Sequence, residues 1–149
     1  MIRQFRAEDA QACCELIHAC VQLDPQMPAA LQERICRAET PEAILHRAGS
    51  FYVVVYDSDE GILGVAGFDM NEVRLLYVTP NHQGRGIGGQ LLAHLESMVP
   101  STPFAEIFVY STFAAVDFYR SHGFAAGGEH VFDFEGESLA TVFMTKATR

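Results

Sequence analysis

The sequence predicts a single mixed α+β domain spanning residues 1–149, with a central, mostly antiparallel sheet of about seven strands flanked by about four helices. Three observations predict this class. The length of 149 residues is typical of one domain. Hydrophobic residues make up 49% and charged residues 19%, enough apolar side chain for a packed core. Helical and strand patterns follow one another irregularly, whereas a parallel α/β fold requires a regular βα alternation.

The first fifty residues are mostly helical after a short strand at residues 2–5. Apolar residues recur at helical spacing between residues 8 and 22. Two prolines at positions 25 and 28 end that helix, and a second helical stretch covers about residues 29–37. Thr40 and Pro41 then provide an N-cap and a first-turn proline for a further helix, which ends near Gly49.

From residue 51 the chain becomes rich in β-branched and aromatic residues, which is typical of strands. Residues 51–56 and 62–70 form a predicted hairpin, because an acidic, glycine-containing turn separates them. Another strand covers residues 72–78, and Pro80 ends it. Three antiparallel-looking strands in succession are therefore expected in the middle of the chain.

The second half continues with an amphipathic helix at residues 86–99, which Pro100 ends. The remaining elements are, in order, a strand, a short helix and two strands, at residues 104–109, 113–121, 124–134 and 139–146. Phe132 and Phe134 fit the pattern of the first of these last two strands, and we expect them in the core.

The composition excludes several classes of partner. Nineteen acidic against ten basic residues give a formal net charge of −9, which repels phosphate backbones and disfavours nucleic acid. No apolar run approaches the roughly 18 residues of a membrane-spanning helix. The first residues lack the apolar run of a signal peptide, so we expect a cytoplasmic protein. The four cysteines show no zinc-type spacing, and we expect no metal site.

The most informative segment is a glycine-rich turn between the strand at 72–78 and the following helix. Glycine-rich turns at helix N-termini bind phosphates through backbone N–H groups, and an arginine adds positive charge. The residues concerned are Gln83, Gly84, Arg85, Gly86, Ile87, Gly88 and Gly89. A turn that binds nothing would not require four glycines in six residues.

A dinucleotide site is another interpretation, because Gly84, Gly86 and Gly89 match G-x-G-x-x-G. That fingerprint belongs to the first βα unit of a parallel sheet and needs an acidic residue about 20 positions further on, at a strand end. Here the turn follows three antiparallel-looking strands, and Glu106 stands at the start of its strand. An oxidoreductase is therefore the least favoured hypothesis.

A third interpretation accounts for more of the chain. The strand residues Leu76-Tyr77-Val78-Thr79-Pro80, followed by Gln83-Gly84-Arg85-Gly86-Ile87-Gly88, resemble the acetyl-CoA motif Q/R-x-x-G-x-G/A of the GNAT superfamily of N-acetyltransferases. About 30 residues later, the segment from Ser111 to Phe124 is similar to the family signature N/S-x-x-A-x-x-F-Y-x-x-x-G-F. Because the two motifs occur in the family's order, the chain resembles a GNAT N-acetyltransferase over nearly its whole length.

The resemblance implies acetyl-CoA as co-substrate and a sheet that splays apart between its fourth and fifth strands. The amides of the glycine turn would bind the pyrophosphate. Leu76, Tyr77 and Val78 would pair with the pantetheine arm like another strand, with the Val78 N–H directed at the thioester oxygen. In the second motif the implied cofactor contacts are Thr112, Ala115 and Phe118, and Thr112 stands where many relatives carry Asn.

The resemblance also suggests catalytic groups. Tyr119 matches the family's general acid, and a phenol with a pKa near ~10 carries a proton at neutral pH. Ile107 stands where some relatives carry a basic Glu, and Glu106 should face the opposite side. Glu72 is therefore the preferred general base, acting through water, with Asp69 as the alternative. For Glu72, a solvated charge at a strand end remains an equal possibility.

Two functions follow. The first is an N-acetyltransferase that moves acetyl from acetyl-CoA to a primary amine of a small molecule or peptide within a ternary complex. The alternative is a CoA-binding regulatory module of the same fold without catalysis. In such folds the loop at residues 23–28 and the hairpin at 133–138 select the acceptor. Both are acidic here, which favours a cationic amine. Because relatives often dimerise through their last strands, a homodimer is also compatible with the resemblance.

Overall fold

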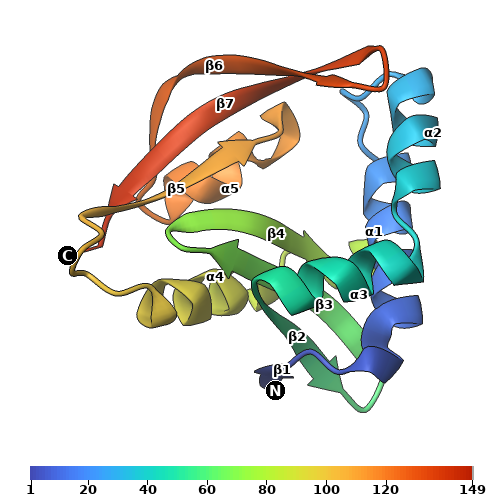
Figure 1. The fold of residues 1–149 in the computed structure, drawn as a ribbon, viewed down its shortest axis with the longest axis horizontal. Coiled ribbons are helices and arrows are strands. Elements are labelled where there is room, and N and C mark those ends of the chain that lie inside the picture. Colours follow the sequence, from blue (N-terminus) through green and yellow to red (C-terminus); the bar gives the residue numbers. More distant parts are fainter. Residues whose placement is uncertain (149) are drawn as a thin grey trace.

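The computed structural model describes residues 1–148, which form one seven-stranded sheet between two layers of helices (Figure 1). The strand order is β1-β2-β3-β4-β5-β7-β6. Each neighbouring pair is antiparallel except β4 and β5, which are parallel. The strands are β1 (Ile2–Gln4), β2 (Tyr52–Ser58), β3 (Gly61–Asp69), β4 (Glu72–Val78), β5 (Glu106–Ser111), β6 (Ala125–Phe134) and β7 (Glu137–Ala147).

Five α-helices flank this sheet, one for each helical stretch that the sequence predicted, although the fold class was expected to have about four. They are α1 (Ala10–Gln22), α2 (Ala29–Ala38), α3 (Pro41–Ser50), α4 (Ile87–Met98) and α5 (Val116–Ser121), with short 3-10 turns at η1 (Ala7–Asp9), η2 (Pro80–His82) and η3 (Phe113–Ala115). The predicted cap of α3 is confirmed, since the Ala43 N–H donates to Thr40 Oγ1 at 3.1 Å. No helix among residues 1–148 is long and apolar enough to cross a membrane.

Each face of the sheet has its own hydrophobic core. On one face α1 and α3 pack against β2, β3 and β4, and the centre of this cluster includes Ile17, Ile44 and Val65. On the other face α4 and α5 pack against the sheet, with Leu91, Leu92 and Met144 fully buried. The two clusters fix the helices on both sides of the central strands.

The sheet opens between β4 and β5, as the resemblance implied. These strands pair only at Glu72 with Phe108 and at Val73 with Val109, and they diverge beyond those residues (Figure 1). A register shift between Gly67 and Phe68 bends β3 and β4 at the same level. The C-terminal parts of β4 and β5 therefore border a split in the sheet.

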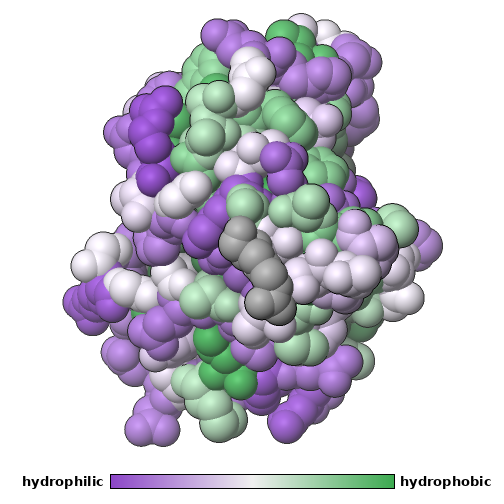
Figure 2. All heavy atoms as spheres, turned by 90° about the vertical axis from the view of Figure 1, so that its left-hand side faces the viewer, coloured by the Kyte–Doolittle hydropathy of each residue, from purple (hydrophilic) through white to green (hydrophobic). Residues whose placement is uncertain are grey.

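The β6–β7 hairpin crosses over this split and contacts α2. Arg34 of α2 donates to the Glu135 carbonyl oxygen, and its Nε lies 3.7 Å from Glu137 Oε1. In Figure 1 the hairpin arches from the C-terminal end of the sheet to the top of α2. Figure 2 shows a mixed surface, with apolar residues gathered in its upper half between hydrophilic ones.

The N-terminus is tied down by an arginine that bridges two acidic residues. Arg3 binds both carboxylate oxygens of Asp9 at 2.9 Å, and its Nε lies 2.8 Å from Asp57 Oδ2. The Arg6 N–H also donates to Asp9, at 2.8 Å. Burial leaves only 6% of the Asp9 side chain exposed, and the Arg3 guanidinium lowers the pKa of this carboxyl. This network joins β1, η1 and β2.

Candidate active site

The glycine turn has the open, left-handed backbone that the sequence predicted. Gly84 and Gly86 have φ angles of +77° and +87°, which L side chains rarely adopt. A Cβ atom at Gly84 would find nothing within 4 Å, and one at Gly86 would meet only Gln90 Nε2 at 4.0 Å. The turn therefore faces open space.

The first turn of α4 has unpaired N–H groups that face this space. Gly86 is the N-cap and no side chain caps the helix. The first helical hydrogen bond runs from the Gln90 N–H to the Gly86 carbonyl at 3.0 Å, so the N–H groups of Ile87, Gly88 and Gly89 have no helical partner. Arg85 is exposed beside them. Such an uncapped N-terminus next to a cation suits a phosphate group.

Gly88 and Gly89 are also required for packing, because a side chain at either position would collide with a neighbouring ring. A Cβ at Gly88 would lie 3.0 Å from Phe118 Cε1, and one at Gly89 would lie 2.7 Å from His122 Nε2. These glycines allow α5 and its exit to pack closely against α4. Two of the four predicted glycines thus serve the α4–α5 contact as well as offering their amides.

Backbone groups of β4 line the split. The Thr79 N–H donates to the Leu63 carbonyl at 2.9 Å, and Val78 is opposite Gly64 in the register with β3. In an antiparallel ladder, alternate residues direct their N–H and C=O groups to opposite sides. Leu76 and Val78 therefore direct theirs away from β3, toward the side where β5 has separated from β4.

The Val78 carbonyl already accepts two hydrogen bonds. Gln83 Nε2 donates at 2.9 Å, and Cys20 Sγ of α1 donates at 3.1 Å. Burial raises the pKa of the Cys20 thiol to about 11, so it stays protonated and acts as a donor. The contact between Cys20 and this site was not predicted from the sequence. Helical spacing indicated that the residue is buried but not which strand it contacts.

Tyr119 lies in α5, buried between aromatic rings. Its ring centroid is 5.2 Å from that of Phe118 and 5.3 Å from that of Phe124, and only 5% of the residue is exposed. Burial raises the pKa of its phenol well above the ordinary value, with a smaller contribution from Tyr77 of β4. The proton therefore stays on this oxygen at neutral pH.

The carboxylates considered as bases differ in their surroundings. Glu72 is half-buried, and desolvation raises the pKa of its carboxyl despite Arg74 Nη1 at 3.8 Å. Asp69 is more exposed and lies 3.6 Å from the same arginine atom. Ile107 is fully buried in the core on the α4 face, and Glu106 is exposed. Only Glu72 combines partial burial with a raised pKa.

The second motif follows β5 at the other border of the split. Ser111 ends the strand, and the Thr112 backbone carbonyl accepts from the Ala115 N–H at 3.1 Å at the start of η3. The Thr112 side chain makes no capping hydrogen bond and is partly exposed, and Ala115 is partly exposed as well. Phe118 packs on His122, with ring centroids 4.6 Å apart.

A family model described as "Acetyltransferase (GNAT) domain" matches residues 16–147, most of the chain. The chain belongs to the GNAT acetyltransferase family. It is therefore an acyltransferase of the acetyl-CoA-dependent class.

Solved structures share the fold of this acetyltransferase. A GCN5-related N-acetyltransferase from Rhodopseudomonas palustris superimposes with a TM-score of 0.92 at 22% identity, covering 99% of this chain and 94% of that one. PaiA N-acetyltransferase from Thermoplasma acidophilum, solved with coenzyme A, gives 0.76 at 19% identity, covering 99% and 98%. YncA, a putative acetyltransferase from Salmonella typhimurium solved with acetyl-CoA, gives 0.69 at 20% identity, covering 100% and 94%. No curated protein matches the sequence.

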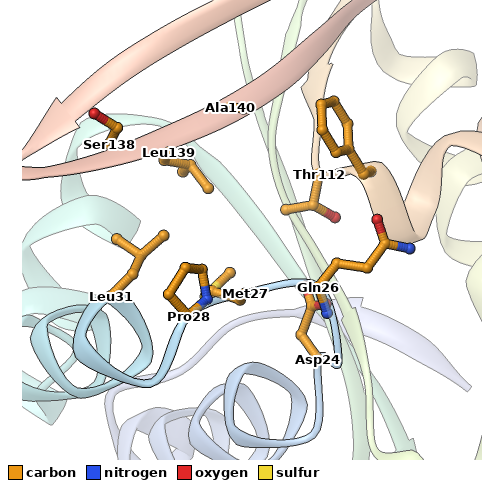
Figure 3. A pocket seen from close by; sticks show the side chains of 10 residues that line it. Asp24, Gln26, Met27, Pro28, Leu31, Thr112, Ser138, Leu139 and Ala140 are labelled. Carbon is orange, nitrogen blue, oxygen red and sulfur yellow. The ribbon is translucent and has the colours of Figure 1, made fainter.

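The acetyltransferase also has a pocket between the two segments expected to select the acceptor. It measures about 230 Å³ and is lined by the α1–α2 loop, α2, the start of η3 and β7. In Figure 3, Met27, Pro28 and Leu31 face Leu139 across it. Asp24 is its one charged lining residue within the described chain, and the Glu137 carboxylate lies near Arg34 instead. The expected acidity of this region is thus partly neutralised.

The described residues offer no site for a metal ion. Within residues 1–148, no three or more His, Cys, Asp or Glu side chains are arranged to hold one.

Proposed function

We propose that this acetyltransferase transfers the acetyl group of acetyl-CoA directly to a primary amine of a small molecule or peptide within a ternary complex. One observation carries the proposal: at a split between parallel strands, β4 backbone groups that point away from β3 lie beside an uncapped, glycine-rich helix N-terminus. The complexes of PaiA with coenzyme A and of YncA with acetyl-CoA support the choice of co-substrate.

In this proposal the chain's backbone binds most of the co-substrate. The amides from Gly84 to Gly89 bind the pyrophosphate, and Arg85 adds charge. Leu76, Tyr77 and Val78 border the pantetheine arm from the β4 side. Thr112, Ala115 and Phe118 border it from the β5 side. Gln83 releases the Val78 carbonyl when a pantetheine amide takes its place.

Two side chains move protons in the transfer. The amine nitrogen attacks the thioester carbon, and its proton passes through water to the Glu72 carboxylate. As the carbon–sulfur bond breaks, the Tyr119 hydroxyl donates its proton to the sulfur, which leaves as the thiol. The products are an amide and coenzyme A, and both side chains regain their starting protonation states from solvent.

A second function is favoured by one observation. Ile107 occupies the fifth-strand position where some relatives carry a catalytic Glu, and it is only 1% exposed within the core. A CoA-binding module without catalysis is compatible with this replacement. Because Glu72 supplies a carboxylate on the neighbouring strand, we favour the enzyme.

An acceptor screen tests the proposal. The protein is incubated with acetyl-CoA and a panel of amines, while thiol release and the mass of the acetylated product are measured. We expect thiol release to depend on a primary amine and to match product formation. Acetyl-CoA binding without turnover on any amine would instead establish the regulatory module.

A further inference from the structure

A cluster of aromatic side chains on the C-terminal part of the sheet belongs to neither core. It comprises Phe108 and Tyr110 of β5, Phe143 of β7, and His130 and Phe132 of β6, and we call it the aromatic wall. Tyr110 is at its centre, with its ring centroid 5.3 Å from His130, 5.1 Å from Phe132 and 5.3 Å from Phe143. The expectation that Phe132 lies in the core is wrong, because it is 38% exposed.

These rings lie on one face of the three strands. Val109 and Met144, which alternate with Tyr110 and Phe143 and pair with each other, belong to the core beneath α4 and α5. The wall therefore faces the opposite side. There α1 and α3 cover β2, β3 and β4, whereas the wall lies on the strands beyond the split.

The wall extends from the carboxylate at the split to the acceptor pocket. Phe108 is in register with Glu72, and the next pair, Val73 and Val109, points into the α4 core. Glu72 therefore shares the face of Phe108. At the other end Phe132 is opposite Leu139, which lines the pocket with Asp24. A row of aromatic rings, tilted or edge-to-face against one another, thus runs between two carboxylates of the site.

Cross-strand aromatic pairs also stabilise sheets, which explains part of this arrangement. Stability alone does not explain why rings from three strands meet beside the split, partly exposed, with acidic groups at both edges. Aromatic surfaces bind flat apolar groups by stacking, and carboxylates beside them attract a cation. The aromatic rings of the wall and the carboxylates at its two ends therefore complement an amine that carries a ring.

We propose that the acceptor is an arylalkylamine, whose ring stacks on the aromatic wall and whose primary amine lies at the Glu72 end. This inference rests on the proposed function and names its substrate class.

A binding experiment tests the inference without catalysis. The chain contains no tryptophan, so added tryptamine is the sole indole in the sample and its fluorescence can be excited apart from that of the five tyrosines. We expect saturable binding that weakens about tenfold in Tyr110→Leu and in Phe132→Leu, since each removes one stacking face. Val131→Ala is the matched control, because Val131 is 57% exposed on the same strand and faces the other side. Unchanged tryptamine affinity in both wall variants would overturn the inference.

Kinetics with paired acceptors separate this inference from the proposed function. We expect a higher kcat/KM for tryptamine and phenethylamine than for hexylamine or spermidine, and the wall variants should remove that preference. Acetylation of spermidine or hexylamine at rates equal to tryptamine would overturn the inference and leave the function intact. Tryptamine binding with no acetylated product from any amine would overturn the function and leave the binding inference intact. A dimer that Phe132→Leu dissociates, with tryptamine binding unchanged, would show instead that the wall joins two copies.

Discussion

The Tyr119 side chain has two roles: its hydroxyl donates a proton in the proposed reaction, and its ring packs in the core. The ring packs between Phe118 and Phe124, and burial raises the pKa of the hydroxyl so that it stays protonated at neutral pH. Replacing the hydroxyl by hydrogen therefore leaves the packing intact and removes a proton donor that acts only as the thiolate leaves.

For Tyr119→Phe we predict a turnover about 10²–10⁴ times lower, with acetyl-CoA affinity little changed. Steady-state rates and a cofactor-binding titration measure the two effects. Tyr52→Phe is the control, because it removes a hydroxyl that contacts His94 at 3.3 Å, away from the site. If the pre-steady-state acetyl-transfer step is unchanged in Tyr119→Phe, Tyr119 is only a core residue.

Glu72 gives the reaction a characteristic pH dependence. A base works when deprotonated, so activity falls as the pH decreases through its pKa, and burial raises the pKa of Glu72 above that of an exposed Glu. In Glu72→Gln we predict a large loss of kcat/KM near neutral pH that shrinks as the pH rises, because the amine then loses its proton unaided. A pH profile of kcat/KM for both proteins measures this.

Asp69→Asn is the matched control for the base, since Asp69 shares Arg74 with Glu72 but is more exposed. We expect the profile of Asp69→Asn to follow that of the wild type. The reverse result, with the profile lost in Asp69→Asn and kept in Glu72→Gln, would assign the base to Asp69.

At the residue scale, the sequence predicts turn glycines and candidate catalytic residues better than it predicts contacts between residues far apart in the chain. Glycine at a strand–helix turn and Tyr in a motif carry information in their type and spacing. The hydrogen bond from the Cys20 thiol to the Val78 carbonyl depends on how α1 lies across β4, which no local sequence pattern encodes. Likewise, strand alternation assigns Phe132 to a face but does not tell whether a helix covers that face.

Among the elements, the glycine turn combines two requirements, an unusual backbone and an open face. The φ of +87° at Gly86 strains any L side chain, and the same holds for Gly136, with φ +90°, in the β6–β7 turn. For Gly86→Ala and Gly136→Ala we predict similar losses of stability, about 1–2 kcal/mol. Only Gly86→Ala should weaken acetyl-CoA binding, by tenfold or more, because its methyl group and the altered turn displace the amides that bind the pyrophosphate.

Unfolding curves and cofactor titrations on the two glycine variants measure these effects. Equal acetyl-CoA affinity in both folded variants would exclude the turn from the binding site.

Most helices and strands follow from sequence periodicity and from the residues that end them, such as Pro80 and Pro100. The boundaries differ where side chains outside the element decide them. The first helix was expected from residue 8 but begins at Ala10, because the Asp9 carboxylate binds Arg3 and the Arg6 N–H. The short helix expected at 113–121 is divided into η3 and α5.

For the whole molecule, the pattern indicates how many strands there are but not which of them are neighbours. Alternation determines the face of each side chain, and many strand orders satisfy the same alternation. The split between β4 and β5 was expected only through the family resemblance. The hairpin that crosses to Arg34 was not expected from any local signal, because that contact joins residues far apart in the chain.

The N-terminal network connects stability to pH across the molecule. Asp9 is nearly buried and binds Arg3 through both oxygens, so removing its charge leaves polar groups without partners. For Asp9→Asn we predict a loss of about 3 kcal/mol at neutral pH, as for other broken buried pairs. Asp57→Asn should lose less than about 1 kcal/mol, because 34% of the Asp57 side chain is exposed and solvent screens its pair.

The sign of the pH effect follows from the lowered pKa of Asp9. A carboxyl with a lower pKa in the folded state stabilises the fold above its unfolded value of about 3.9, and this contribution disappears as the pH falls through the folded value. The difference in stability between wild type and Asp9→Asn should therefore be largest near pH ~7 and shrink below pH ~4. Urea unfolding followed by circular dichroism at several pH values measures it. A difference that stays constant with pH would show that Asp9 acts through packing and not through its charge.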